Sequence, residues 1–386
     1  MRIGLFTDAY YPIISGVSIS VDILVKEFTK LGHEVIVITN DHDDAQITDH
    51  VVRVKGVRLP MKGLREYRIG KVTRKKVREI GNLNLDIVHC HTEFTMGRLG
   101  RKTARKNHIP VVHTYHTMYE DYVHFVSKAF SFPLRVISKW YSRSFAKSAD
   151  EVIFPTIKVK NTFDKYGFKG SSHIIPTGIY IDRFRKLNFH QNDLDNLKQQ
   201  LGFNKDDFIA LFLGRMSREK SIEELIKHFH KISKKHNDIK LLFVGGGPDI
   251  PLFKKEIENY SLTDKVVFTG MVPPVETPKY YQIADLFINF SVTETQGLTY
   301  YEALASSTPL LVKYDDNLEN IIIQGKNGYA FNDNDDFDRY FDMIKNDENK
   351  LNNMKKHAAE TVQKFSASNY AKSIEKIYKK LLEKEG

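Results

Sequence analysis

The chain is poor in cysteine and has no long apolar run. Cys90 is the single cysteine among 386 residues, so no disulfide can form within the chain. No stretch of 18 apolar residues occurs, which predicts that nothing spans a membrane. Residues 1–8 have the pattern of a strand that carries an aspartate rather than of an apolar leader. These absences favour a protein of a reducing, cytoplasmic compartment.

Several motifs of common binding sites are also missing. There is no G-x-x-x-x-G-K-[ST] element, which argues against a P-loop nucleotidase. Histidine, cysteine and acidic residues nowhere have metal-ligand spacing, so we expect no metal site. Asp41-His42-Asp43 and Asp333-Asn334-Asp335 are interpreted as solvated loops. Because no nucleic-acid recognition motif is present either, we expect no nucleic-acid partner.

Positive charge is concentrated in the first half of the chain. Residues 51–150 hold 21 basic and 7 acidic side chains, whereas the whole chain has a net charge of +10. A one-sided charge of this kind indicates an anionic partner, such as a membrane surface or an acidic polymer. The alternative is a basic surface that serves only solubility.

Short apolar segments alternate with helical patterns along most of the chain. This alternation predicts an α/β protein with parallel sheets covered on both faces, and there are too many strands for one sheet. We place a boundary in the polar stretch near residue 188, giving domains 1–187 and 188–365, and a C-terminal helix within 366–386. The expected strands are Arg2–Asp8, Glu34–Thr39, Leu85–Cys90, Ile109–Thr114, Glu151–Pro155, His173–Pro176, Phe208–Gly214, Lys240–Gly245, Lys265–Thr269, Leu286–Ser291 and Pro309–Lys313.

Two glutamates follow the expected strand 286–291. Glu294 lies in a loop, and Glu302 lies inside a helix that begins near Gly297. Free backbone N–H groups at the start of this helix can bind a diphosphate. A carboxylate inside the helix can accept hydrogen bonds from a ribose, and one in the preceding loop can accept them from a sugar. The alternative is an ordinary helix start with scattered acids.

A basic turn joins the first strand of the second domain to its helix. Arg215 and Lys220 are five residues apart there, a spacing that allows both to grip a diphosphate and to neutralise a leaving group. A solvated basic turn is the alternative. Arg218 lies in the same turn and is assigned no role.

Three further motifs are weaker on their own. Gly245-Gly246-Gly247-Pro248 follows a strand but lacks the G-x-G-x-x-G spacing. Gly16 opens a helix, where it could admit a phosphate or where Ser15 could simply be an N-cap. His113 and His116 flank the end of a strand, where ligands bind in open α/β sheets. We predict that His116 belongs to the site and leave His113 open.

The order of these motifs resembles that of the retaining glycosyltransferase family 4, which has the GT-B fold. The residues that carry the resemblance are Ser15-Gly16-Val17, Asp86-Ile87-Val88-His89, His116, Gly214–Lys220, Gly245–Pro248 and the Glu294…Glu302 pair. The resemblance implies two Rossmann-like domains facing across a cleft, with the C-terminal helix returning to the first domain. It also implies a nucleotide-sugar donor and no metal cofactor.

The same resemblance assigns roles to individual residues. Arg215 and Lys220 would bind the donor diphosphate, Glu302 the ribose, and Glu294 the transferred sugar. His116 would lie beside that sugar and form the catalytic set with Glu294, Arg215 and Lys220. The further donor-binding positions that it implies are Gly16, Gly246, Val272, Gly297, Leu298 and Thr299.

One departure from the family pattern narrows the expected substrate. Thr295-Gln296-Gly297-Leu298-Thr299, together with the segment His113–Tyr122, is similar to that of bacterial diacylglycerol glucosyltransferases. This implies transfer of a hexose, glucose in the first instance, from UDP-glucose to diacylglycerol in glycolipid and lipoteichoic-acid anchor synthesis. Alternatives are a soluble or polymeric acceptor, or a non-catalytic partner subunit. The intact Arg215, Lys220, Glu294 and Glu302 argue against the latter.

A lipid acceptor predicts that the enzyme docks on the inner face of the cell membrane. Two segments mix basic residues with apolar or aromatic ones, as an interfacial element needs. They are residues 58–80 and residues 122–147. The alternative is that the aromatic side chains face the core and the charges are solvated. A homo-oligomer is left open.

Overall fold

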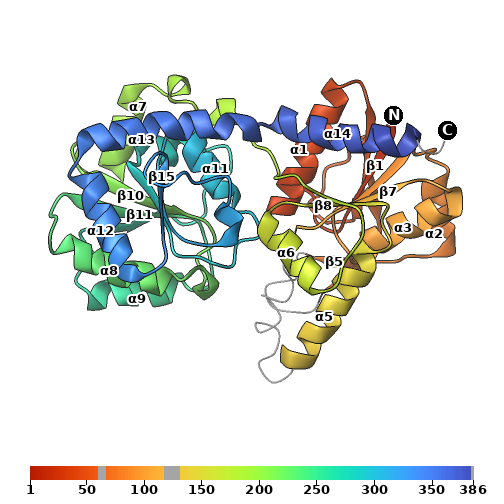
Figure 1. Cartoon of the computed structure of the whole chain (residues 1–386), viewed down its shortest axis with the longest axis horizontal. Helices are drawn as coiled ribbons and strands as arrows, with labels where there is room; N and C mark the ends of the chain where they lie inside the picture. Colours follow the sequence, from red (N-terminus) through yellow and green to blue (C-terminus); the bar gives the residue numbers. More distant parts are fainter. Residues whose placement is uncertain (60–66, 117–130, 384–386) are drawn as a thin grey trace. The chain divides into compact units, whose positions relative to one another are not determined.

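The computed structural model of the chain describes residues 1–59, 67–116 and 131–383 (Figure 1). The chain divides into two compact units. The first comprises Met1–Gly178 together with Ala367–Gly386, and the second is Ile179–Ser366. Each unit has its own parallel sheet and its own hydrophobic core. Among the described residues, no helix combines the length and the apolar character needed to cross a membrane.

The first unit is built on a seven-stranded sheet of order β3-β2-β1-β6-β7-β8-β9, in which every pair of neighbouring strands is parallel. Its central strands are short and, apart from Arg2 at the start of β1, fully buried because helices cover both faces. Cys90 on β6 pairs with both Phe6 on β1 and His113 on β7, so these three strands end at one edge. The strands are β1 (Arg2–Thr7), β2 (Glu34–Asn40), β3 (Val51–Val54), β6 (Ile87–Cys90), β7 (Val111–Thr114), β8 (Glu151–Phe154) and β9 (Ser172–Ile174).

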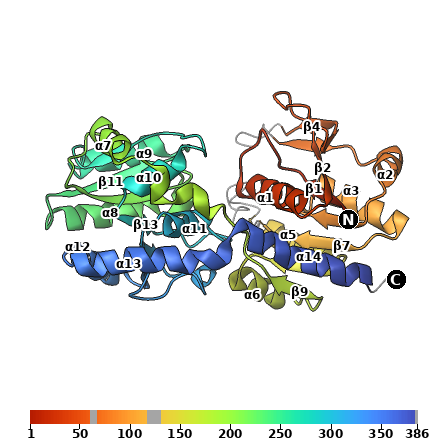
Figure 2. The ribbon, with the colours of Figure 1, turned by 90° about the horizontal axis from the view of Figure 1, so that it is seen from above.

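The helices of the first unit include the last helix of the chain. Helix α14 (Ala367–Glu383) lies beside α1 (Gly16–Lys30), as Figures 1 and 2 show. Tyr370 on α14 shares a hydrogen bond of 2.9 Å with the Ser20 hydroxyl on α1. The other helices are α2 (Arg74–Gly81), α3 (Thr95–Asn107), α5 (Ser131–Ala146) and α6 (Ile157–Lys165), and a hairpin joins β4 (Gly56–Arg58) to β5 (Arg68–Gly70).

The second unit is built on a six-stranded parallel sheet of order β12-β11-β10-β13-β14-β15. Alternate residues of β10 enter two separate core clusters, with Ala210 and Phe212 in one and Ile209 and Leu211 in the other. Helices therefore cover both faces of this sheet. Its strands are β10 (Phe208–Leu213), β11 (Ile239–Val244), β12 (Val266–Phe268), β13 (Leu286–Asn289), β14 (Leu310–Lys313) and β15 (Gly328–Phe331).

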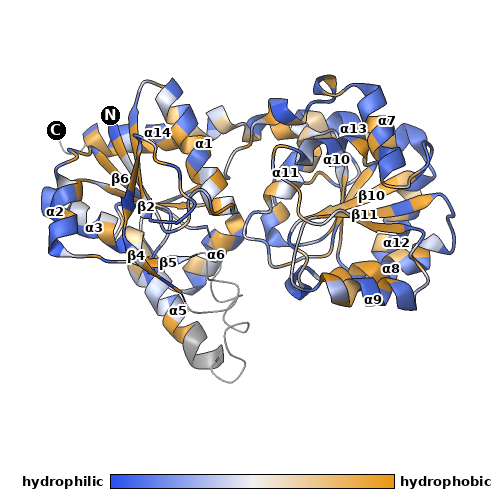
Figure 3. Cartoon of the chain, turned by 180° about the vertical axis from the view of Figure 1, so that it is seen from behind, coloured by the Kyte–Doolittle hydropathy of each residue, from blue (hydrophilic) through white to orange (hydrophobic). Residues whose placement is uncertain are grey.

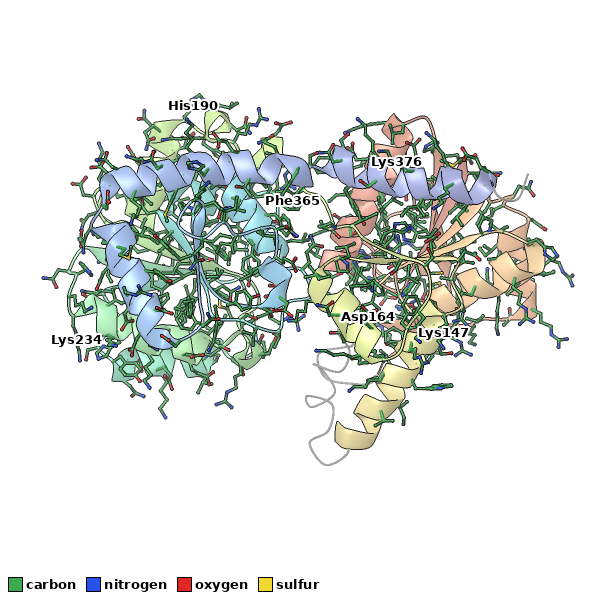
Figure 4. The ribbon with its side chains drawn as sticks, in the orientation of Figure 1. Lys147, Asp164, His190, Lys234, Phe365 and Lys376 are labelled. Atoms are coloured by element: carbon green, nitrogen blue, oxygen red, sulfur yellow. The ribbon has the colours of Figure 1, made fainter. Side chains whose placement is uncertain are left out.

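Seven α-helices accompany this second sheet among the described residues. Figure 4 shows their side chains, with Lys234 labelled just after α8 and His190 just before α7. The helices are α7 (Gln191–Gln200), α8 (Ile222–Ser233), α9 (Ile250–Asn259), α10 (Thr277–Ile283), α11 (Leu298–Ala305), α12 (Asn334–Lys345) and α13 (Glu348–Thr361).

The second unit begins earlier than the polar composition around residue 188 suggests. Ile179, Ile181 and Phe184 are buried in one of its core clusters, so the chain has entered this unit at Ile179. The polar stretch near residue 188 continues into α7, whose Leu194 and Leu197 are also buried there. The polar residues of this stretch belong to the exposed side of a short amphipathic helix, which has a composition similar to that of a linker.

Candidate active site

The expected donor-binding residues of the second unit gather at the carboxyl edge of its sheet. Arg215 follows β10, Gly246 follows β11, and Glu294 follows β13. These three strands are neighbours in the sheet, because β10 pairs with both β11 and β13. Ligands bind at this edge in open α/β sheets.

Lys220 and Glu294 form an ion pair at this edge. Lys220 ends a short 3-10 helix (η3, Arg218–Lys220), and its Nζ lies 2.7 Å from Glu294 Oε1. Two further contacts fix the glutamate loop: the Thr293 hydroxyl donates to the Glu219 carbonyl at 3.2 Å, and the Asn317 amide donates to the Glu294 carbonyl at 3.3 Å. The structure thus brings one expected diphosphate ligand directly against the expected sugar ligand.

Arg215 has a different environment from the other basic residues of its turn. Its side chain is exposed and makes no ion pair within the described part of the chain. Arg218, in contrast, is held by Glu223, with its Nε 2.9 Å from a carboxylate oxygen. Arg215 is therefore the uncompensated cation of the turn, and Arg218 is neutralised, which agrees with its having no assigned role.

Helix α11 and its N-cap hold four further residues that are expected to bind the donor. Gly297 is its N-cap with φ of 75°, a left-handed conformation that favours glycine. Leu298 and Thr299 are its first two residues, whose N–H groups have no partner within the helix. Glu302 lies one turn later. These positions are partly exposed, so a ligand can reach them.

Glu302 is held by a buried tyrosine. The Tyr281 hydroxyl on α10 donates to Glu302 Oε2 at 2.8 Å. Burial raises the pKa of Glu302 from 4.5 to about 7, although the Tyr281 hydrogen bond and the nearby Arg183 lower it. A carboxylate that is costly to ionise and lies at a ligand-binding edge is a frequent property of functional sites.

The glycine loop after β11 is shaped by the turn after β10. A Cβ on Gly245 would meet the Gly214 carbonyl oxygen at 2.0 Å, and one on Gly247 would meet the Met216 carbonyl oxygen at 2.1 Å. These two glycines are thus explained by packing alone. Gly246 faces only the Met271 side chain, and Val272 next to it is partly buried against the core. Gly246 and Val272 therefore lie in adjacent loops, as their expected shared role requires.

A cluster of histidines occupies the carboxyl edge of the first unit's sheet. His113 is buried on β7, where its Nδ1 donates to the Cys90 carbonyl at 2.9 Å and its Nε2 lies 3.3 Å from the buried Glu93 carboxylate. His116, just beyond β7, is partly exposed and contacts His91. Burial lowers the pKa of His116 to about 3. His116 can therefore meet a ligand, whereas His113 is enclosed by protein.

Ser15 caps the start of α1, whereas Gly16 has no structural role in the described part of the chain that needs a glycine. Ser15 is the N-cap, and its side chain and that of Ser18 form a reciprocal capping box. A Cβ on Gly16 would contact no atom of the protein, and Gly16 has no positive φ. Nothing within the described chain therefore requires a glycine at this position.

Sequence reasoning missed several residues that the structure places in these two clusters. His89 and His91 follow the same rule that selected His113 and His116, because they lie at the end of β6, next to β7. That rule could have found them. Tyr281 could not be found in this way, since only folding brings α10 against α11.

Asp41-His42-Asp43 lies in a loop after β2, as expected, whereas the interpretation of Asp333-Asn334-Asp335 as a loop is wrong because this segment begins α12. Asp41 and Asp43 both form ion pairs with Arg68, and Asp43 also pairs with Arg58. Asp333 is the N-cap of α12. Within the described ranges, no three histidine, cysteine or acidic side chains are arranged so that they could hold a metal ion.

Comparison of the sequence with known proteins identifies the family of the chain. The profile of Glycosyltransferase Family 4 matches residues 14–183, and that of Glycosyl transferases group 1 matches residues 193–361. The α-monoglucosyldiacylglycerol synthase of Acholeplasma laidlawii is 38% identical over 390 aligned residues, which cover 100% of this chain and 98% of the relative. The chain belongs to this glycosyltransferase family. A second α-monoglucosyldiacylglycerol synthase, from Streptococcus pneumoniae, is 39% identical over 83% of this chain and 73% of its own length.

Solved structures support the fold of this glycosyltransferase. Anabaena HepE, in complex with UDP and glucose, superposes with a TM-score of 0.79 and 16% identity, covering 98% of this chain and 100% of that one. Sucrose-phosphate synthase from Thermosynechococcus elongatus gives a TM-score of 0.77 at 20% identity, with 98% of each chain covered. The chain has the GT-B fold of these glycosyltransferases.

Proposed function

We propose that this glycosyltransferase moves glucose from UDP-glucose to the free hydroxyl of diacylglycerol and retains the anomeric configuration. Two observations together support the proposal. The chain is related over its full length to an α-monoglucosyldiacylglycerol synthase, and the four residues expected to bind the donor are present at one edge of a sheet. Arg215, Lys220, Glu294 and Glu302 all lie at the carboxyl edge of one sheet. The UDP and glucose bound by HepE fit the same class of donor.

The proposed donor contacts follow from charge and geometry. Arg215 and Lys220 stabilise the negative charge that develops on the departing diphosphate. The N–H groups of Leu298 and Thr299 at the start of α11 add a further favourable field for phosphate. Glu302 accepts from the ribose hydroxyls, and Glu294 accepts from hydroxyls of the glucose.

The proposed reaction is a front-face displacement. The bond from the anomeric carbon to the diphosphate oxygen breaks, its electron pair goes to UDP, and the acceptor oxygen bonds to that carbon on the same face. The acceptor proton passes to the departing phosphate. A double displacement would need a carboxylate nucleophile, and neither Glu294, paired with Lys220, nor the buried Asp8 is suited to it. Asp8 accepts hydrogen bonds from Thr92, Thr95, Asn40 and the Met96 N–H.

A bilayer acceptor requires the enzyme to reach the membrane, and α5 is the element that we assign to this task. Val136, Ile137 and Trp140 are 53%, 59% and 67% exposed and follow one another at helical spacing. Figure 3 shows α5 with mixed hydropathy, extending from the sheet of its own unit. Lys139 on α5 and Lys147 just after it (Figure 4) add positive charge, as an interfacial helix needs.

Of the aromatic and basic residues expected at the membrane, some contact the protein instead, and others lie outside the described residues. Phe145 is buried and Tyr141 donates to the Glu93 carbonyl at 2.5 Å, so these two face the protein. Arg58 and Arg68 are neutralised by acids, and Lys76 pairs with Glu79. Residues 60–66 and 117–130, with the side chains of 131–135, lie outside the described residues. They include Lys62, Arg65, Tyr122, Phe125, Lys128, Phe130, Phe132, Leu134 and Arg135.

The single tryptophan makes the membrane proposal directly testable. Trp140 is the only tryptophan of the chain, so its fluorescence reports on α5 alone. We expect a blue shift of its emission with vesicles of phosphatidylglycerol, reversed as salt rises, and little shift with phosphatidylcholine vesicles. An unchanged emission in both, with normal lipid glucosylation, would remove α5 from the membrane interface.

The transfer itself is tested by product analysis. Purified enzyme receives UDP-glucose, UDP-galactose or UDP-N-acetylglucosamine together with diacylglycerol vesicles, and mass spectrometry identifies the product. We expect monoglucosyl-diacylglycerol from UDP-glucose. Glucose transfer to a soluble or polymeric acceptor but not to diacylglycerol would replace the lipid acceptor, and no transfer to any acceptor would favour a non-catalytic subunit.

A further inference from the structure

The histidines of the first unit form an ordered contact series at the carboxyl edge of its sheet. His89 lies on the buried strand β6, His91 follows that strand directly, and His116 follows the adjacent strand β7. His91 is buried, whereas His116 is partly exposed. A ligand that reaches His116 therefore contacts a ring whose buried side lies against His91.

The contact between His91 and His116 is a hydrogen bond in the plane of the rings. His91 Nδ1 lies 3.0 Å from His116 Nε2, and the ring centres are 5.2 Å apart with planes inclined by 20°. If one ring lay on top of the other, the ring centres would be much closer than 5.2 Å for this N···N distance. The two rings therefore face each other edge to edge. This alignment suits an N–H···N hydrogen bond.

One proton lies between His91 Nδ1 and His116 Nε2 in this hydrogen bond. Burial, first of all, lowers the pKa of His91 well below its usual value, and burial lowers that of His116 to about 3. Both rings are therefore neutral near pH 7, and each carries one N–H and one lone pair. One ring must donate and the other must accept.

The other nitrogen of His91 decides the direction. His91 Nε2 is buried and has no hydrogen-bond partner among the described residues. A proton on Nε2 would be a buried donor without an acceptor, a state that folded proteins largely avoid, whereas an unused lone pair is tolerated better. The proton of His91 therefore belongs on Nδ1, from which it is donated to His116 Nε2.

A second histidine fixes the ring of His91. The His89 ring lies against it, with centres 4.1 Å apart. His89 is itself held at both nitrogens, by the Tyr378 hydroxyl at 2.6 Å and the Thr114 hydroxyl at 2.7 Å. Because His89 cannot rotate without losing both hydrogen bonds, the face on which His91 packs is fixed.

We propose that His91 is a positioning residue that fixes the tautomer of His116. Its Nδ1–H occupies the Nε2 lone pair of His116, so that His116 presents its own Nδ1–H to the substrate. His116 then acts as a hydrogen-bond donor to a hydroxyl oxygen of the sugar or acceptor and does not accept the acceptor's proton. This inference rests on the proposed function, from which the place of His116 beside the sugar is taken.

The tautomer can be measured without any assay of activity. Protein labelled with 15N in the histidine rings distinguishes a protonated from an unprotonated ring nitrogen, and His116→Gln identifies the signals of His116. We expect His116 to carry its proton on Nδ1 in the wild-type protein. A proton on Nε2 of His116 would overturn the proposal, whatever the activity of the enzyme.

Two substitutions separate the hydrogen bond from the packing of the ring. His91→Phe keeps a ring against His89 but removes the donor. His91→Asn loses the ring but retains an N–H attached at Cγ, as in the histidine. We expect His91→Phe to lower kcat about ten-fold or more, the scale of one oriented hydrogen bond in a transition state, with KM for UDP-glucose nearly unchanged. His91→Asn should recover most of the lost kcat.

The outcomes distinguish this proposal from the proposed function. Equal losses in both variants, together with lower thermal stability, would reduce His91 to a packing residue. Normal kcat in His91→Phe would also contradict the positioning role. If the wild-type enzyme glucosylates another acceptor, the lipid proposal fails, while the tautomer of His116 and the kcat contrast between the two variants still decide the role of His91.

Discussion

Lys220 Nζ lies 2.7 Å from Glu294 Oε1, so two residues expected to bind different parts of the donor neutralise each other at the edge of one sheet. The side chains are 12% and 20% exposed, and the pair is thus partly shielded from water. If Lys220 binds the donor diphosphate, as proposed, this binding draws on the same cation. The Glu294 carboxylate would then compete with the diphosphate for Lys220 until a sugar hydroxyl engages the carboxylate.

This competition gives opposite predictions for binding and for turnover in Glu294→Ala. Lys220 is released by the substitution, so the affinity for UDP should stay the same or rise. Turnover with UDP-glucose should fall strongly, because the sugar loses its carboxylate acceptor. Calorimetric titration of UDP and steady-state kinetics measure the two effects. A clear loss of UDP affinity would contradict the assignment of Glu294 to the sugar.

Arg215 and Lys220 should both be needed for turnover. Arg215→Ala and Lys220→Ala each remove one charge that stabilises the leaving group, a contribution of typically about 2.7–4 kcal/mol in the transition state. Arg218→Ala is the matched control, because Arg218 is held by Glu223 in the same turn. Comparison of kcat for the three variants tests this. Equal losses in all three would point to a general effect of turn stability.

Nucleotide affinity should depend on pH through Glu302. Its pKa is raised to about 7, so the carboxylate is ionised above pH 7 and protonated below it. An ionised carboxylate accepts from both ribose hydroxyls, and UDP affinity should therefore fall as pH drops from 8 to 6. Glu302→Gln should flatten the profile. Tyr281→Phe removes a hydrogen bond that lowers this pKa, so the midpoint should move to higher pH.

The same raised pKa predicts an effect on stability. A carboxyl whose pKa is higher in the folded than in the unfolded state costs stability once pH exceeds its unfolded value, and the full cost is reached above its folded pKa. Glu302→Gln should therefore raise the Tm of the nucleotide-free protein at pH 8 more than at pH 4. Thermal denaturation at the two pH values measures the difference. A Tm that falls at pH 8 would contradict it.

Gly16 and Gly297 should respond differently to a methyl group. In Gly297→Ala the new Cβ would lie 2.5 Å from the Tyr300 ring in a left-handed conformation, so stability should fall by about 1–2 kcal/mol or more. In Gly16→Ala the Cβ meets no protein atom, and stability should be kept. If a phosphate approaches Gly16, turnover should nevertheless fall. Unchanged kcat and KM would leave Gly16 as a helix start alone.

The basic face of α2 should contribute to binding of anionic vesicles. Arg74, Lys75 and Arg78 are exposed there, and each cation near such a surface is worth about 1 kcal/mol. Reversing all three to glutamate should weaken co-sedimentation with phosphatidylglycerol vesicles. Reversal of the exposed Lys227, Lys234 and Lys254 in the second unit makes the same change of net charge and serves as the control. Equal weakening in both would indicate a nonspecific effect of net charge.

The sequence predicted the strands, the two-unit α/β architecture and the edges where polar residues gather, because apolar strands alternating with helices leave few other arrangements. Gly297 as a helix start and Ser15 as a cap follow from local chemistry alone. Strands β3, β4, β5 and β15 were not among the expected strands. The residues of β3 are mostly only partly buried and lack a clear apolar run, and β4, β5 and β15 are only three or four residues long.

Contacts between distant segments were beyond sequence reasoning. Periodicity gives α5 an apolar face but does not tell whether Phe145 or Trp140 is buried, and the structure buries only Phe145. Tyr281 against Glu302 and Tyr378 against His89 depend on which helices become neighbours. Basic segments likewise could not show that Arg58 and Arg68 find acids on another loop.

The last helix has a consequence for the order in which the protein can fold during synthesis. Helix α14 places Tyr370 and Tyr378 in the interior of the first unit, yet it is translated only after the whole second unit. The ribosome therefore releases the first unit without the helix that completes its core and holds His89. Domains usually fold in the order of their synthesis. Here the unit that is made first must be finished last, so premature termination within the second unit would leave both units incomplete.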